Sequence, residues 1–159
     1  MTDDVTLVDL AGEELATYLV HLEKSYADDM HRLGGVPIDE AREKSRRSMA
    51  ELFPDGQPAE GNQLWRAQDP EGATVGILWL ARRDDGAGDP YAWIYDIEVE
   101  ESRRGQGWGR QLMRAAERIS REWGLRSLRL NVFGDNATAR NLYRSQGFRE
   151  QAVQMAKDL

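Results

Sequence analysis

A glycine-rich basic segment between a predicted strand and a predicted helix constrains this chain more than any other feature. The segment Arg103–Arg110 reads RRGQGWGR. Aromatic and β-branched residues of Tyr91–Val99 favour a strand before it. After it, apolar residues recur at helical spacing, namely Leu112, Ala115, Ala116, Ile119 and Trp123. Glycines let backbone N–H groups approach an anion, and a helix start favours negative charge. The order therefore predicts a phosphate-binding turn.

The glycine spacing excludes two common phosphate-binding motifs. A P-loop needs GxxxxGK[ST], and the chain contains no Gly-Lys-Ser or Gly-Lys-Thr. The glycines at 105, 107 and 109 read GxGxG instead of the dinucleotide pattern GxGxxG. The segment matches a third pattern, Arg-x-x-Gly-x-Gly, with Arg104, Gly107 and Gly109 at its fixed positions. An ordinary β-to-α turn with solvent-facing arginines is the alternative on this segment alone.

Periodicity and turn residues predict a mixed α+β order of elements over 159 residues, which we expect to form one domain. The predicted strands are 5–10, 62–68, 73–81, 91–99, 128–132 and about 148–157. The predicted helices are 11–34, 37–52, 107–123 and 136–146. We expect a mixed, mostly antiparallel sheet with helices on both faces.

A second motif near the C-terminus is more specific. Residues Asn136–Phe148 read Asn-x-x-Ala-x-x-Leu-Tyr-x-x-x-Gly-Phe, about thirty residues after the Arg104 turn. On these two motifs the chain resembles the GCN5-related N-acetyltransferase (GNAT) superfamily, and the similarity covers nearly its whole length. The resemblance implies six to seven strands flanked by about four helices, with acetyl-CoA as cosubstrate and no metal.

The resemblance assigns a binding site for coenzyme A. The pyrophosphate would bind the turn, comprising Arg104, Gly105, Gln106, Gly107, Trp108, Gly109 and Arg110, with Arg104 ranked above Arg103 and Arg110. The pantetheine arm would pair with the backbone of Ile97, Glu98 and Val99, with Asn131 a weaker candidate. Asn136 would cap its helix and also contact the cofactor. Trp108 is better explained by packing on the sheet.

The same resemblance assigns the acid and base of an acetyl transfer. Tyr143 would protonate the departing thiolate, although helical spacing alone favours a core tyrosine. Strand alternation puts Asp96 and Glu98 on one face, with Tyr95, Ile97 and Val99 on the other. Glu98 is the first candidate for the base and Asp96 the alternative. The alternative is that both carboxylates are ordinary solvated residues of the strand without a catalytic role.

Composition narrows the function further. The absence of cysteine excludes a thiol nucleophile, and two histidines leave little for a metal site. A net charge of −7 argues against nucleic acid and suits a cationic amine. The acidic start and the lack of a long apolar run predict a cytoplasmic protein without membrane contact. The resemblance places the acceptor site at the first two helices, where Tyr18, His21, Tyr26 and His31 are candidates.

Taken together, these features predict a single-domain N-acetyltransferase. The acceptor would be a primary amine of a small molecule, peptide or protein that attacks the thioester directly in a ternary complex. A non-catalytic acyl-CoA sensor and a structural dimerisation domain are the alternatives, and a homodimer stays open.

Overall fold

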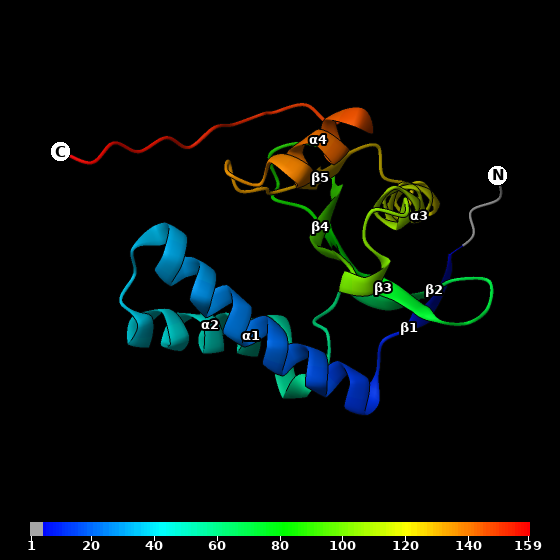
Figure 1. Cartoon of the computed structure of the whole chain (residues 1–159), viewed down its shortest axis with the longest axis horizontal. Helices are drawn as coiled ribbons and strands as arrows, with labels where there is room; N and C mark the ends of the chain where they lie inside the picture. Colours follow the sequence, from blue (N-terminus) through cyan, green and yellow to red (C-terminus); the bar gives the residue numbers. More distant parts are fainter. Residues whose placement is uncertain (1–4) are drawn as a thin grey trace.

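The computed structural model describes residues 5–159 (Figure 1). Residues 1–4 lie outside the described residues, and they form the acidic start on which the prediction of a cytoplasmic protein partly rests. The strands are β1 (Thr6–Asp9), β2 (Asn62–Gln68), β3 (Thr74–Arg83), β4 (Tyr91–Val99) and β5 (Leu128–Leu130). The helices are α1 (Gly12–Gly34), α2 (Ile38–Leu52), α3 (Trp108–Glu122) and α4 (Ala137–Ser145), with short 3-10 turns η1 (Pro54–Gly56) and η2 (Glu101–Arg103). No helix within 5–159 is long and apolar enough to cross a membrane.

The strands form one sheet in the order β1-β2-β3-β4-β5. Neighbours are antiparallel except β4 and β5, which run parallel and pair only over Ala92–Ile94 and Leu128–Leu130. The predicted α+β class and the mixed sheet are confirmed. The described strands number five rather than the expected six to seven.

Helices cover both faces of the sheet, as predicted, because β3 is apolar on both sides. Leu78 and Leu80 point into a core with α3, whereas Trp79 between them joins a second core with α1 and α2. All three side chains are at most 2% exposed. Figure 1 shows α1 and α2 below the sheet and α3 and α4 above it. The sheet is thus the partition between two sets of helices.

A bulge in β4 changes which side chains face α1. Leu80 pairs with Ile94 and Trp79 pairs with Asp96, so Tyr95 is an extra residue in β4. Such an insertion interrupts the two-residue alternation of a strand. Tyr95 stacks on Trp79 with ring centroids 4.4 Å apart, on the same side as Asp96. The predicted placement of Tyr95 opposite Asp96 is therefore wrong, while Asp96 and Glu98 do share the α1 side.

The predicted last strand at 148–157 is absent from the described structure. After Phe148, which contacts Tyr143, the chain continues as an extended, exposed tail that leads away from α4 (Figure 1). Glu150 is bound by Arg140 and Arg144 of α4, whereas Met155 is 88% exposed. A strand needs a neighbour for its backbone groups, and β5 offers an edge of only three residues.

Candidate active site

The glycine turn leaves a set of backbone donors at the start of α3. Gly105 and Gly107 have φ angles of 74° and 90°, which side chains rarely adopt. The first helical hydrogen bond runs from the N–H of Gln111 to the carbonyl of Gly107, over 3.2 Å. The N–H groups of residues 108–110 precede that bond, and helix geometry offers them no partner. A Cβ at Gly105 or Gly107 would meet nothing within 4 Å, so the space above the turn is open.

The arginines of this turn have different environments. Arg103 forms an ion pair with Asp69 of the β2–β3 turn, and its guanidinium lies 5.3 Å from the ring centroid of Trp108. Trp108 itself packs on the core beside α3, as predicted. Arg104 is exposed, and its Nε donates to the carbonyl of Val99 over 3.2 Å. Arg104 is therefore accessible to an anion, whereas Arg103 is already bound within the protein.

Asp69 holds Arg103 through a network of its own. Its carboxylate also accepts the N–H groups of Glu71 and Ala73, at 3.1 and 2.8 Å. Burial by itself would raise the pKa of Asp69, but the Ala73 N–H and the Arg103 guanidinium together hold that pKa below its ordinary value. The ion pair thus ties the glycine turn to the neighbouring hairpin.

The parallel strands separate directly beside the glycine turn. The β4–β5 ladder ends at Ile94 and Leu130, so the backbone of residues 95–99 has no partner strand on that side. The start of α3, the end of β4 and α4 meet there, because a Cβ at Gly109 would lie 3.2 Å from Leu142 and 3.8 Å from Val99. This arrangement leaves the main chain of Ile97, Glu98 and Val99 able to bind an extended ligand arm.

Asp96 is the most perturbed carboxyl of the region. The Tyr18 hydroxyl, from α1, donates to its Oδ2 over 2.6 Å. Burial raises the pKa of Asp96 to about 6, although the Tyr18 hydrogen bond acts in the opposite direction. Glu98 differs, since its side chain is 43% exposed and lies 3.9 Å from His21 Nε2. Asp96 therefore changes protonation state close to neutral pH.

Helix α4 brings Tyr143 toward Asp96. Asn136 caps this helix by accepting the N–H of Ala139 over 3.1 Å, which confirms its predicted capping role. Burial and, next, the charge of Asp96 raise the pKa of Tyr143. The phenol thus stays protonated at neutral pH and lies within electrostatic reach of the Asp96 carboxylate.

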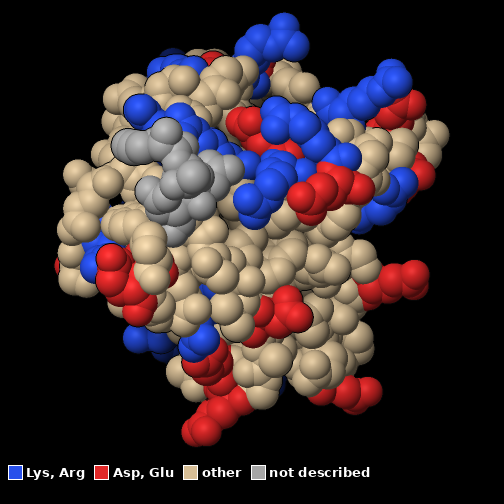
Figure 2. Space-filling model, turned by 90° about the vertical axis from the view of Figure 1, so that its right-hand side faces the viewer, with Lys and Arg blue, Asp and Glu red and all other residues tan. Residues whose placement is uncertain are grey.

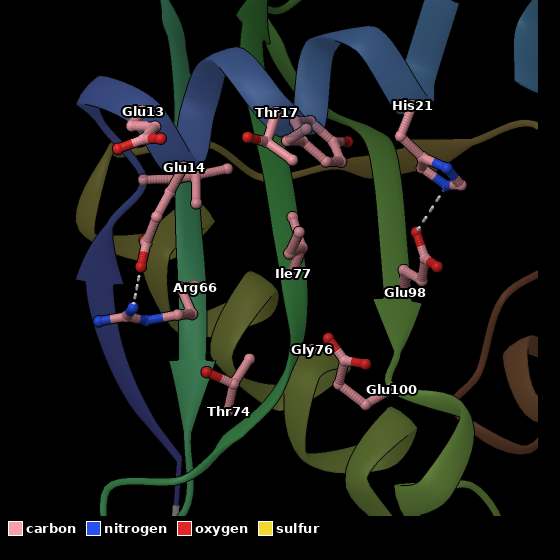
Figure 3. Close-up of a pocket in the computed structure, with 12 residues that line it drawn as sticks. Glu13, Glu14, Thr17, His21, Arg66, Thr74, Gly76, Ile77, Glu98 and Glu100 are labelled. Carbon is pink, nitrogen blue, oxygen red and sulfur yellow. Dashed lines mark hydrogen bonds and ion pairs between the residues drawn. The ribbon is translucent and has the colours of Figure 1, made fainter. Parts of the chain in front are cut away.

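An open cavity of about 520 Å³ lies between α1 and the sheet (Figure 3). Its lining residues come from the segment before α1, from α1, β2 and β3, and from the end of β4 with the residue that follows it, namely Leu10, Glu13, Glu14, Thr17, Tyr18, His21, Arg66, Thr74, Gly76, Ile77, Glu98 and Glu100. Four are carboxylates, and the basic residues among the rest are Arg66, which binds Glu14, and His21, which lies beside Glu98. The cavity wall is therefore mainly negative.

Charge is distributed unevenly between the two sides of the sheet. On the face shown in Figure 2, Lys and Arg side chains gather in the upper half, the level of α3 and α4 in Figure 1. Asp and Glu side chains are more prominent in the lower half, at the level of α1 and α2. On this face, basic side chains are thus concentrated at the level of α3, and acidic ones at the level of α1.

Comparison with known proteins identifies the family. The model of the Acetyltransferase (GNAT) family matches residues 18–148. The chain belongs to this family. A relative named uncharacterized N-acetyltransferase YycN, from Bacillus subtilis, is 33% identical over 98% of this chain and 99% of its own length. The crystal structure of that putative acetyltransferase superposes with a TM-score of 0.87 over 98% of both chains.

Two more distant similarities are to proteins whose names state what they act on or bind. Streptothricin acetyltransferase from Streptomyces lavendulae is 34% identical over 62% of this chain and 57% of its own. The structure of AAC(6')-Iy in complex with the bisubstrate analogue CoA-S-monomethyl-acetylneamine has a TM-score of 0.60. At 17% identity over 98% of this chain and 97% of that one, it shows a shared fold. The present chain is an acetyltransferase of a family that uses acetyl-CoA.

The GNAT fold brings together most, but not all, of the residues predicted from the sequence. Tyr18 and His21 line the cavity, whereas Tyr26 is 43% exposed and His31 Nδ1 donates to the Val36 carbonyl at the far end of α1. Sequence reasoning missed Glu13 as a cavity residue and the bond between Tyr18 and Asp96. The sequence does hold a signal for the inward orientation of Tyr18. It follows Leu15 by three residues, and this spacing puts both side chains on one face of the helix.

Proposed function

We propose that this GNAT protein transfers the acetyl group of acetyl-CoA to a primary amine that is cationic in solution. The observation that carries the proposal is the continuity of three features. The open glycine turn lies beside the gap between β4 and β5, Asp96 lies on the stretch of β4 that β5 does not pair and acts by its charge on Tyr143, and the acidic cavity adjoins Asp96 through Tyr18. Acetyl-CoA supplies the acetyl group as a thioester.

The residues of the turn and the gap suit the cosubstrate. Backbone N–H groups at the α3 start and the exposed Arg104 would bind the pyrophosphate. The free main chain of residues 97–99 would hold the pantetheine arm. The reaction also needs a base, because an ammonium ion must lose a proton before its nitrogen can form the amide bond.

We assign the two carboxylates of β4 to different tasks. Glu98, exposed in the cavity wall, would attract the ammonium group. Asp96 would accept its first proton, the new C–N bond would form as the C–S bond breaks, and Tyr143 would protonate the leaving sulfur. The second proton that the nitrogen loses as it becomes an amide would return to the Tyr143 oxygen. Asp96 suits the role of base because its pKa of about 6 leaves it ionised, yet basic, at neutral pH. A non-catalytic sensor would need neither ionisable group.

Coenzyme A should raise the melting temperature of the protein. A ligand that binds only the native state at a hundred times its dissociation constant adds about 2.7 kcal/mol to the free energy of unfolding. Gly107→Glu should abolish the rise, because it adds a negative side chain to the space above the α3 start. Thermal denaturation with and without saturating coenzyme A measures both effects.

Gly86→Glu is the matched control for that substitution. Gly86 has a φ angle of 71° and open space around it, as Gly107 does, but lies in the loop between β3 and β4. It should lose similar intrinsic stability and keep the full coenzyme A response. An equal loss of response in both variants, or no response in the unsubstituted protein, would refute the assignment of the turn.

Acceptor amines with additional positive charge should react with lower KM than neutral or acidic ones, and added salt should raise that KM. The carboxylates of the cavity attract cations, and exposed charges are screened beyond a Debye length of ~8 Å at physiological ionic strength. Thiol release from acetyl-CoA, followed over a panel of matched amines at two salt concentrations, measures the preference.

Glu100→Gln and Glu43→Gln separate a local effect of the cavity from the net charge. Both remove one negative charge, but Glu100 lines the cavity and Glu43 pairs with arginines on the exposed face of α2. Only Glu100→Gln should raise the KM of cationic acceptors. Equal effects, or a preference for acidic acceptors, would assign the acidic surface to solubility.

A further inference from the structure

Tyr18 belongs to two environments at once. It lines the cavity from α1, and its hydroxyl donates to Asp96, which is not among the cavity-lining residues. Only 6% of Tyr18 is exposed, so the side chain is part of the wall rather than a mobile surface group. Figure 3 shows α1 crossing over the strands with the side chains of this helix turned toward the cavity.

The groups that face Asp96 come from three elements. Tyr18 and His21 project from α1, Glu98 follows two residues later on β4, and Tyr143 comes from α4. His21 and Glu98 act on Asp96 through charge, whereas Tyr18 forms a direct hydrogen bond. Tyr18 therefore connects the cavity wall to the buried carboxylate by a direct hydrogen bond of 2.6 Å.

We propose that the Tyr18 hydroxyl carries the proton of the acceptor amine from the cavity to Asp96. This inference rests on the proposed function of the same site. The ammonium N–H bond breaks as its proton passes to Tyr18 Oη, and the original hydroxyl proton passes to Asp96 Oδ2. The amine becomes neutral, Asp96 becomes a carboxylic acid, and Tyr18 ends with one proton as it began.

The environment of Tyr18 suits a group that exchanges protons without ionising. Burial, then the charges of Asp96 and Glu98, raise the pKa of Tyr18 above its ordinary value. A separate phenolate is accordingly disfavoured, and the two transfers must occur together. The hydrogen bond from Tyr18 also opposes the rise in the pKa of Asp96. It thus favours the ionised carboxylate, which is the form that can accept a proton.

Tyr18→Phe tests this role, because it keeps the packing of the ring and removes only the hydroxyl. We expect kcat to fall by about ten- to a hundredfold, with the KM for acetyl-CoA unchanged. The acid limb of the pH–kcat profile should move to higher pH, because loss of the donated hydrogen bond raises the pKa of Asp96. Tyr26→Phe, on the exposed side of the same helix, should change neither quantity.

The possible results separate this inference from the proposed function. An unchanged kcat and an unchanged acid limb in Tyr18→Phe, together with a crippled Asp96→Asn, would overturn the role of Tyr18 alone. An Asp96→Asn variant with normal kcat would overturn the assignment of the base, and the Tyr18 role with it. A tenfold or greater loss of kcat with a shifted acid limb in Tyr18→Phe, and neither in Tyr26→Phe, supports the transfer.

Discussion

Asp96→Asn should lower kcat by about a hundred- to ten-thousandfold, because it removes the group assigned as base while keeping its size. The pH–kcat profile of the unsubstituted protein should rise through about pH 6, where Asp96 loses its proton. The residual activity of the variant should lack that limb. Steady-state rates between pH 5 and pH 9, with an acceptor of fixed charge state, measure both effects.

The same substitution should make the protein more stable at neutral pH. The pKa of Asp96 is higher in the folded protein than its ordinary 3.8, so the folded state binds the proton more tightly than the unfolded state. Above pH 6 the buried carboxylate must ionise, which opposes folding by an amount that Asn avoids. We expect a gain on the order of 1–2 kcal/mol at pH 8, absent near pH 4.

Asp89→Asn provides the comparison, since Asp89 is an exposed residue of the loop between β3 and β4. It should alter neither kcat nor the free energy of unfolding. Loss of activity without a gain in stability at pH 8 would mean that Asp96 is stabilised in its ionised form. A crippled Glu98→Gln beside a normal Asp96→Asn would instead make Glu98 the base.

Tyr143→Phe should lower the rate of the chemical step by about ten- to a thousandfold while the coenzyme A response of the melting temperature stays intact. The phenylalanine ring keeps the contact with Phe148, where ring centroids are 5.8 Å apart, and loses only the proton donor. Single-turnover measurements isolate this step from product release. An unchanged single-turnover rate would make Tyr143 a packing residue of α4.

The sequence predicted the features that depend on local chemistry. The glycine turn, the order of helices and most strands, and the Asn136 cap each follow from neighbouring residues. The family match over residues 18–148 confirmed the resemblance based on two motifs.

Features that depend on pairing between distant segments were not predictable in the same way. The bulge at Tyr95 is one extra residue within an otherwise regular alternation, and it becomes visible only against β3. The bond from Tyr18 to Asp96 spans 78 positions in the chain. The tail after Phe148 was predicted as a strand from its place in the order of elements, but it reads REQAVQMAKDL, with a single β-branched residue, and pairs with no described strand.

Under the proposed function, the ion pair between Asp69 and Arg103 would let the hairpin turn between β2 and β3 influence ligand affinity at a distance. Because Asp69 fastens the glycine turn in advance, little chain disorder remains to be removed when a phosphate group arrives. The binding constant for the donor would then depend on Asp69, which lies outside the turn assigned to the donor. Sequence changes in this turn would then adjust how much acetyl donor the protein needs in order to work.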